Sequence, residues 1–153
     1  MNRLLCLALV ALTLVAVPAV FAQEPAPAAD PAAPADDQMK GLDAMVDKAL
    51  EAYNNQDFKA FYADFTSTMA GITTEQAFST MYTNMYFNKY GKYKSRELIK
   101  EETVVPANPA ETPVGLLQYK AVFEKNEQVK ISVNITREGD AWKLMQVQFN
   151  KIQ

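Results

Sequence analysis

The chain has 153 residues and a net charge of −3, with one cysteine and no histidine. The missing histidines exclude imidazole-based acid–base catalysis and metal ligation, and the lone Cys6 excludes a disulfide framework and thiolate metal sites. The balanced charge excludes the basic surface that nucleic-acid binding requires, so we expect no nucleic-acid partner.

The first 22 residues are predicted to be a secretory signal peptide. Arg3 gives a positive start, residues 4–17 form an uncharged apolar run, and Ala22 ends a small-residue cleavage pattern. The alternative is a transmembrane anchor, but the run of about 14 residues is shorter than the roughly 20 that span a bilayer. We therefore expect cleavage after Ala22 and a mature chain without a transmembrane segment. Such a protein is exported, periplasmic or secreted, and of bacterial type.

Residues 23–37 contain four prolines, four acidic residues and no large apolar side chain. This composition predicts a disordered Pro/Ala-rich linker, because it offers no apolar surface to bury. Two interpretations stay open: a spacer that holds the domain away from a surface, and a solubilising leader without a partner. Residues 38–153 then form a single domain with 14 basic and 14 acidic residues. That length is enough for one hydrophobic core.

Three amphipathic helices are expected at the start of the domain. Residues 38–54 place apolar side chains on one face at a 3.6-residue period. Asp57 is a suitable N-cap for a short second helix. Thr73, with Gln76 three residues later, predicts the start of a third helix, and Gly91 its end. The predicted inner face of the third helix consists of Phe78, Met81, Tyr82, Met85 and Tyr86.

From Tyr93 onward the apolar period changes to two, which predicts strands. In the last strand the apolar parity shifts after Leu144, and a bulge near Met145–Gln146 would reconcile the two halves. Helices followed by an antiparallel meander predict an α+β domain: three N-terminal helices packed on a curved, cone-like antiparallel sheet of about four strands. The charged first strand is interpreted as a protected sheet edge or as a protein-binding edge. The expected strands cover residues 93–104, 115–124, 128–137 and 142–151.

Three segments carry a resemblance to a known superfamily. Residues Ala49–Phe61 are predicted to form a helix, a polar turn, an acidic residue and a short helix with aromatic side chains. The chain is predicted to end in three strands. In Gly139–Leu144 a turn is followed by Trp142 at the start of the last strand. With these features residues 38–153 resemble the nuclear transport factor 2-like superfamily of cystatin-like α+β cone folds, in particular its small exported members of unknown function. The resemblance implies a curved sheet around a helix, with a cavity between them. Relatives bind small apolar molecules there, isomerise or cyclise them, or dimerise through the outer sheet face, so the fold does not select a function.

One enzymatic scheme is compatible with the composition. A buried carboxylate would act as base and tyrosine hydroxyls as oxyanion donors, as in the ketosteroid-isomerase relatives. The chain has seven tyrosines, but no acid stands at an evident inward position. Asp64 is the best candidate, and its alternative role is that of a surface residue on an amphipathic helix. We therefore assign no catalytic residue, no metal ligand and no cofactor.

A cluster rich in methionine and aromatic residues is the candidate ligand pocket, because such side chains adapt to irregular apolar ligands. The alternative is that they fill the core of a small domain. The leading hypothesis is a non-enzymatic exported domain that binds a small apolar ligand or a protein partner, with a homodimer through the outer sheet face as an option. The alternatives are a pocket enzyme of the isomerase or cyclase type and a structural module of the cell envelope. The candidate pocket residues are Phe61, Phe65, Met69, Met81, Tyr82, Met85, Tyr86 and Tyr119.

Overall fold

The computed structural model describes residues 36–108, 110, 112–125 and 128–152. The predicted signal peptide and all but the last two residues of the predicted linker lie outside these ranges. Those two residues, 36 and 37, already belong to the first helix. The first helix therefore begins two residues before the predicted start of the domain.

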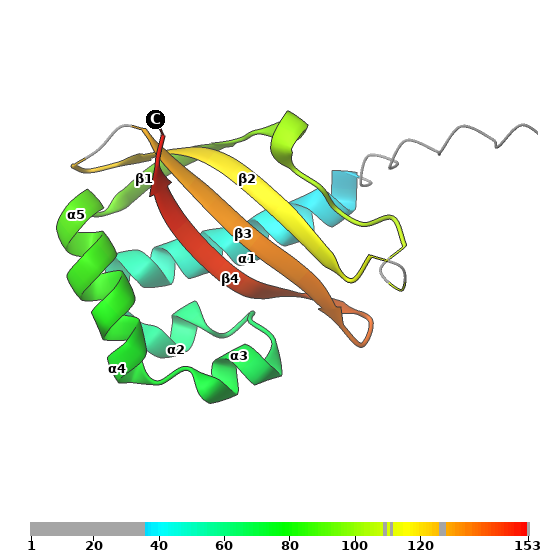
Figure 1. The fold of residues 1–153 in the computed structure, drawn as a ribbon, viewed down its shortest axis with the longest axis horizontal. Helices are drawn as coiled ribbons and strands as arrows, with labels where there is room; N and C mark the ends of the chain where they lie inside the picture. The colour runs from blue at the N-terminus through cyan, green and yellow to red at the C-terminus, as the bar shows by residue number, and fades with distance from the viewer. Residues whose placement is uncertain (1–35, 109, 111, 126–127, 153) are drawn as a thin grey trace, which may run out of the picture.

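Helical segments come first and a four-stranded antiparallel sheet follows, which confirms the predicted α+β class (Figure 1). The first helix lies across one face of the sheet, and the helical segments from α2 to α5 gather at one end of it. The elements are α1 (Asp36–Asn55), α2 (Phe58–Phe61), α3 (Ser67–Ile72), α4 (Glu75–Phe78), the π-helix η1 (Ser79–Phe87), α5 (Asn88–Tyr90), β1 (Tyr93–Leu98), the 3-10 helix η2 (Lys100–Glu102), β2 (Val114–Phe123), β3 (Val129–Glu138) and β4 (Ala141–Lys151).

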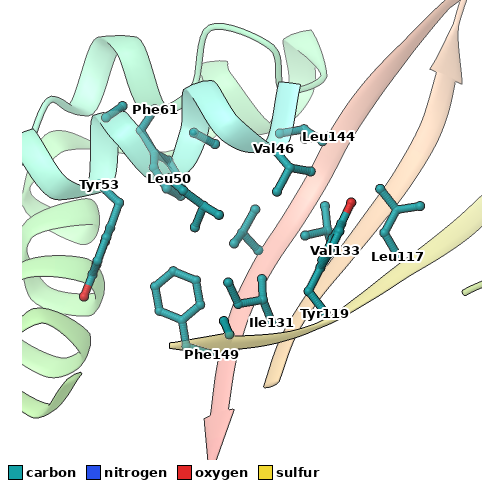
Figure 2. Packing of buried hydrophobic residues seen from close by; sticks show 14 of the residues in the cluster. Val46, Leu50, Tyr53, Phe61, Leu117, Tyr119, Ile131, Val133, Leu144 and Phe149 are labelled. Atoms are coloured by element: carbon teal, nitrogen blue, oxygen red, sulfur yellow. The ribbon is translucent and has the colours of Figure 1, made fainter. Parts of the chain in front are cut away.

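The predicted inner face of α1 is confirmed. Leu42, Val46 and Leu50 are at most 1% exposed, as expected for an amphipathic helix with a 3.6-residue period. Figure 2 shows Val46 and Leu50 directed toward strand residues such as Val133 and Phe149. Each buried side chain of this kind contributes about 1.5–3 kcal/mol relative to an exposed one, so α1 and the sheet stabilise each other.

The caps of the following helices are partly as predicted. The Asp57 carboxylate accepts a hydrogen bond from the Ala60 N–H at 3.0 Å and caps α2, as expected. The prediction that Thr73 starts the third helix is wrong. The Thr74 hydroxyl caps α4 instead, and Thr73 ends α3, an additional short helix that begins after Thr66. Adjacent threonines both fit the capping pattern, and the sequence alone did not separate them.

The third predicted helix buries a different set of side chains from the one predicted, because part of it is a π-helix. A π-helix closes hydrogen bonds five residues apart, so its turns are wider and residues four apart come into line. Phe78 and Tyr82 are buried, with ring centroids 5.2 Å apart, and Tyr90 is buried two such steps further on. Met81 and Met85, predicted to lie on the inner face, are 43% and 52% exposed. The predicted inner face assumed the 3.6-residue period of an α-helix, which does not apply to a π-helix.

The sheet is a meander with the order β1–β2–β3–β4, and every neighbouring pair is antiparallel. The predicted bulge is confirmed: Ile135 pairs with Leu144 and Asn134 with Gln146, which leaves Met145 as the extra residue. The first strand is shorter than predicted, because β1 ends at Leu98 and gives way to η2. The inner face of the sheet carries Leu117, Tyr119, Ala121, Phe123, Val129, Ile131, Val133, Ile135, Leu144, Val147 and Phe149.

The outer face of the sheet is largely polar. The Ser132 hydroxyl donates to Gln118 at 2.9 Å, and the Asn134 amide donates to Gln146 at 3.3 Å, in rows across neighbouring strands. Lys130 forms an ion pair with Glu102 beside them. A homodimer through this face would have to bury side chains that are already hydrogen-bonded. The homodimer therefore remains a prediction, and the polar outer face of the sheet does not support it.

Candidate functional site

Four of the eight predicted pocket residues line one hollow on the helical side of the molecule. Phe65, Met69, Met81 and Tyr82 border a space of about 290 Å³. Phe65 lies between α2 and α3, Met69 belongs to α3, and Met81 and Tyr82 belong to η1. The hollow is completed by Tyr62, Ile72, Thr73, Ala77, Met145 and Gln146.

A second hollow of about 450 Å³ adjoins the first, since both are bordered by Ala77 and Met81. Met85, a fifth predicted residue, lies in this second space, together with polar side chains of α4 and η1. We call the two hollows together the methionine groove. Part of its apolar lining is open to solvent: Ile72 is 68% exposed, Met85 52% and Met81 43%.

The other three predicted residues lie elsewhere. Phe61 is fully buried behind the groove, with its ring 4.4 Å from that of Tyr82. Tyr86 packs against Phe149 on the inner face of the sheet. Tyr119 lies on β2 and donates a hydrogen bond to an aspartate of α1. The predicted cluster is therefore divided into a groove, a packed core and a separate polar site.

The lining of the methionine groove carries no charged side chain among the residues that the structure describes there. The hydroxyl of Tyr82 donates to the Val147 carbonyl at 2.8 Å. Burial raises the pKa of Tyr82 well above its ordinary value, with the neighbouring Tyr62 adding to the effect. Burial likewise raises the pKa of Tyr62, which is partly offset by a hydrogen bond with Thr73. Both phenols are neutral near pH 7, so the groove suits an uncharged apolar molecule.

A polar cluster that was not predicted from the sequence lies beside the middle of α1. Its centre is Arg96 of β1, whose side chain is only 8% exposed. The guanidinium forms ion pairs with Asp43 and Asp47 and donates to the Asp43 carbonyl at 3.0 Å. It also lies 4.8 Å from the centre of the Tyr119 ring. These contacts fasten α1 to the edge of the sheet.

Two sequence signals could have identified this cluster. Asp43 and Asp47 are four residues apart, so they share one side of α1 next to its apolar face. Arg96 is two residues before Leu98, and in a strand this spacing places both on the same face. From the sequence the strand is interpreted as a protected sheet edge or a protein-binding edge, and neither interpretation directs Arg96 inward.

The cluster contains the carboxylate–tyrosine pair that the enzymatic scheme requires, but in a different arrangement. The Tyr119 hydroxyl donates to the Asp43 carboxylate at 2.8 Å, so its hydrogen is not directed at a substrate. Burial and the negative charge of Asp43 raise the pKa of Tyr119. Burial lowers the pKa of Arg96, but its hydrogen bonds to Asp47 and Tyr93 outweigh this and raise it above the ordinary value. The arrangement stabilises an ion pair and leaves no free base.

Asp64, the best carboxylate candidate from sequence, lies at neither site. Its side chain is 26% exposed, and its Oδ2 is 3.4 Å from the Lys48 ammonium group. Although Oδ2 is shielded from solvent and accepts no hydrogen bond in the described part of the chain, this ion pair compensates its charge. Asp64 thus acts as a link between the α2 end and α1.

Two further findings concern the described residues only. No group of three or more His, Cys, Asp or Glu side chains there is arranged to hold a metal ion. No helix within residues 36–152, as far as they are described, is both long and apolar enough to cross a membrane.

Comparison with known proteins adds little to this geometry. No family model and no curated protein matches the sequence. Among solved structures, Bd1075 of Bdellovibrio bacteriovorus is similar to this chain, with 13% sequence identity and a TM-score of 0.47. The similarity covers 77% of this chain and 42% of Bd1075, so the chain spans less than half the length of that protein. A likeness at this level carries no argument about function.

Proposed function

We propose that this protein is an exported, non-enzymatic binding domain that holds a small apolar molecule in the methionine groove. One observation carries the proposal: the groove gathers solvent-exposed methionine and isoleucine side chains around an uncharged hollow. Exposed apolar area of this kind is unfavourable in water and is covered when a ligand binds. Methionine is suited to the task because its unbranched thioether adapts to irregular shapes.

The position of the ligand follows from how the core is filled. In the nuclear transport factor 2-like superfamily, to which we propose this domain is related, the expected ligand space lies between the helix and the curved sheet. That space is occupied here by large side chains: Tyr53 of α1 packs edge-on against Phe123 and Phe149, with ring centroids 6.0 and 5.0 Å apart. We therefore place the ligand on the helical side, between α3 and the α4–η1 helix.

A pocket enzyme of the isomerase or cyclase type is the second candidate. The observation in its favour is the hydrogen bond between Asp43 and Tyr119 beside a hollow of about 430 Å³. A catalytic base must be free to accept a proton from substrate. Asp43 already accepts from Tyr119 and pairs with Arg96, so the geometry favours a structural ion pair over a base.

Mass spectrometry of the native protein tests the proposal. The mature protein would be purified from its natural host without detergent, and small molecules extracted from it would be identified. A variant with both Met69→Lys and Met81→Lys, purified in parallel, serves as the control because charges in the groove oppose apolar binding. We expect an apolar molecule in the wild-type extract that is absent from the variant. The same molecule in both extracts, at equal occupancy, would place it outside the groove.

A further inference from the structure

The helix α3 forms one wall of the methionine groove but has little packing of its own. None of its six residues is buried, and only Met69 and Ile72 face the groove. Gly71 lies inside this helix, and a Cβ added there would meet nothing within 4 Å. A glycine in a helix favours flexibility when no close contact requires it. A helix of this length does not persist in water without support, so α3 depends on contacts at its ends.

The N-terminal end of α3 is held by Glu138, which lies at the end of β3. The Ser67 N–H donates to both carboxylate oxygens of Glu138, at 3.2 and 3.1 Å, and the Ser67 hydroxyl donates to one of them as well. Just before this point, the Thr66 N–H donates to the Leu144 carbonyl at 2.9 Å. The chain is therefore attached to β4 at Thr66, and the contact between Ser67 and the Glu138 carboxylate determines the position of α3.

The opposite end of α3 has weaker support. Thr73 ends the helix, and its backbone N–H donates to the Met69 carbonyl at 3.1 Å. The next element begins at once, because Thr74 caps α4. Only the two capping residues, Thr73 and Thr74, separate α3 from α4, so this junction is the expected hinge at this end and Thr66 the expected hinge at the other.

We propose that α3 is a hinged flap over the methionine groove and that Glu138 is the latch that holds it closed. This inference rests on the proposed function of the groove. With the latch made, Met69 and Ile72 stay against the hollow; with the latch broken, α3 moves away and the hollow opens to an incoming apolar molecule.

Protonation of the Glu138 carboxylate in acid weakens the latch. The hydrogen bonds from Ser67, with a smaller contribution from the positive charge of Lys143, lower the pKa of Glu138. The other charged groups near this turn are Arg137, which donates to the Asp140 carbonyl, and Asp140 itself; α3 carries none. A carboxylate with a lowered folded-state pKa stabilises its contacts above its unfolded pKa and loses that effect as the pH falls through the folded value. The flap is thus closed at neutral pH and is released in acid.

Hydrogen exchange tests the latch without any ligand. Glu138→Ala in the mature protein should raise exchange at residues 67–72 about tenfold, because charge-assisted hydrogen bonds are lost, while the amides of β2 and β3 stay protected. Glu97→Ala is the matched control, since Glu97 is exposed on β1. Lowering the pH of the wild-type protein should reproduce the change after correction for intrinsic exchange rates. Unchanged exchange at 67–72 in Glu138→Ala would overturn the latch.

Binding kinetics connect the flap to the groove. With the neutral fluorescent dye N-phenyl-1-naphthylamine as probe, Glu138→Ala should increase both association and dissociation rates about threefold or more, and Gly71→Ala, which stiffens α3, should decrease them. Unchanged rates in both variants would overturn the gating role. If the dye binds to no variant while exchange at 67–72 still responds to Glu138, the proposed function of the groove fails and the latch stands.

Discussion

Arg96 shows how one side chain can decide the placement of an element. It lies on the inner face of β1, yet its guanidinium reaches Asp43 and Asp47 of α1 and stacks on Tyr119. A planar guanidinium can form these contacts together, whereas the single point charge of a lysine cannot. The contacts hold the middle of α1 against β1, an edge strand of the sheet.

Replacing Arg96 by methionine should lower the free energy of unfolding by about 2 kcal/mol. Removing one partner of a buried pair typically costs about 3–5 kcal/mol, and the estimate is reduced because Asp43 and Asp47 are 40% and 63% exposed. Urea denaturation measures the change. Arg137→Met is the matched control, since Arg137 is exposed and stacks on Trp142. Equal losses in the two variants would contradict the structural role of Arg96.

At the scale of elements, the π-helix η1 explains why the groove is apolar and open. Its wide turns keep Phe78, Tyr82 and Tyr86 in line on the inner side, with successive ring centroids 5.2 and 5.7 Å apart. The same geometry turns Met81 and Met85 outward to the groove. A regular α-helix would have placed these methionines on the inner face, so the groove depends on the helix type.

Deleting Asn84 from η1 should therefore damage the fold. Asn84 is exposed, but as long as η1 keeps its π-helical turns, the deletion moves Tyr86 and Tyr90 out of the row that Phe78 and Tyr82 begin. We expect a loss of about 3 kcal/mol or more in unfolding free energy, comparable to emptying a large aromatic site. The substitution Asn84→Ala keeps the residue count and should change stability by less than about 0.5 kcal/mol. Near-UV circular dichroism and urea denaturation distinguish the two. A deletion variant as stable as the substitution would contradict the register argument.

Elements with one strong period were predictable from the sequence, and those set by tertiary contacts were not. The inner face of α1, the strands β2 to β4 and the bulge at Met145 follow from periods of 3.6 and 2. The helix α3 was missed because its contacts are to Glu138, about 70 residues away in sequence. Met81 and Met85 were predicted to lie on the inner face because the prediction assumed a 3.6-residue period, whereas η1 is a π-helix. Three of the eight predicted pocket residues lie outside the methionine groove, because a sequence does not distinguish exposed apolar side chains from buried ones.

Across the molecule, the packing between α1 and the sheet differs from the packing around α3. The sheet side is closed, with aromatic side chains such as Tyr53 and Phe149 in edge-on contact. The helical side is held by capping hydrogen bonds and leaves the methionine groove open. The core between α1 and the sheet is tightly packed, whereas the α3 wall of the groove is weakly held. This arrangement is expected of a domain whose binding site must open.

The closed side makes a prediction for alkaline pH. Burial raises the pKa of Tyr53, Tyr82 and Tyr119. Their contribution to stability is therefore fully present below the unfolded value, about 10, and is lost as the pH rises through the folded values. Tyrosinate absorbance of these residues should appear only together with loss of the far-UV circular dichroism signal. The urea-unfolded chain should titrate near pH 10 for all tyrosines. Complete titration near pH 10 with the fold intact would contradict the closed core.

Export makes a separate prediction about the chain's start. If residues 1–22 are removed by a signal peptidase, the protein isolated from its host begins at Gln23. Intact-mass measurement of that protein checks the expectation. A mass that includes residues 1–22 would contradict export by cleavage, while leaving the domain and its groove as described.

The central claim is that the methionine groove binds apolar molecules, and a fluorescence titration tests it most directly. N-phenyl-1-naphthylamine would be added to the mature protein, to Met81→Gln and to Val104→Gln. Both replaced side chains are exposed, at 43% and 49%, but only Met81 lines the groove. Because a polar side chain in the groove opposes burial of the dye, we predict at least about fivefold weaker binding for Met81→Gln and wild-type binding for Val104→Gln. No binding by the wild-type protein, or equal affinity in all three, would contradict the claim.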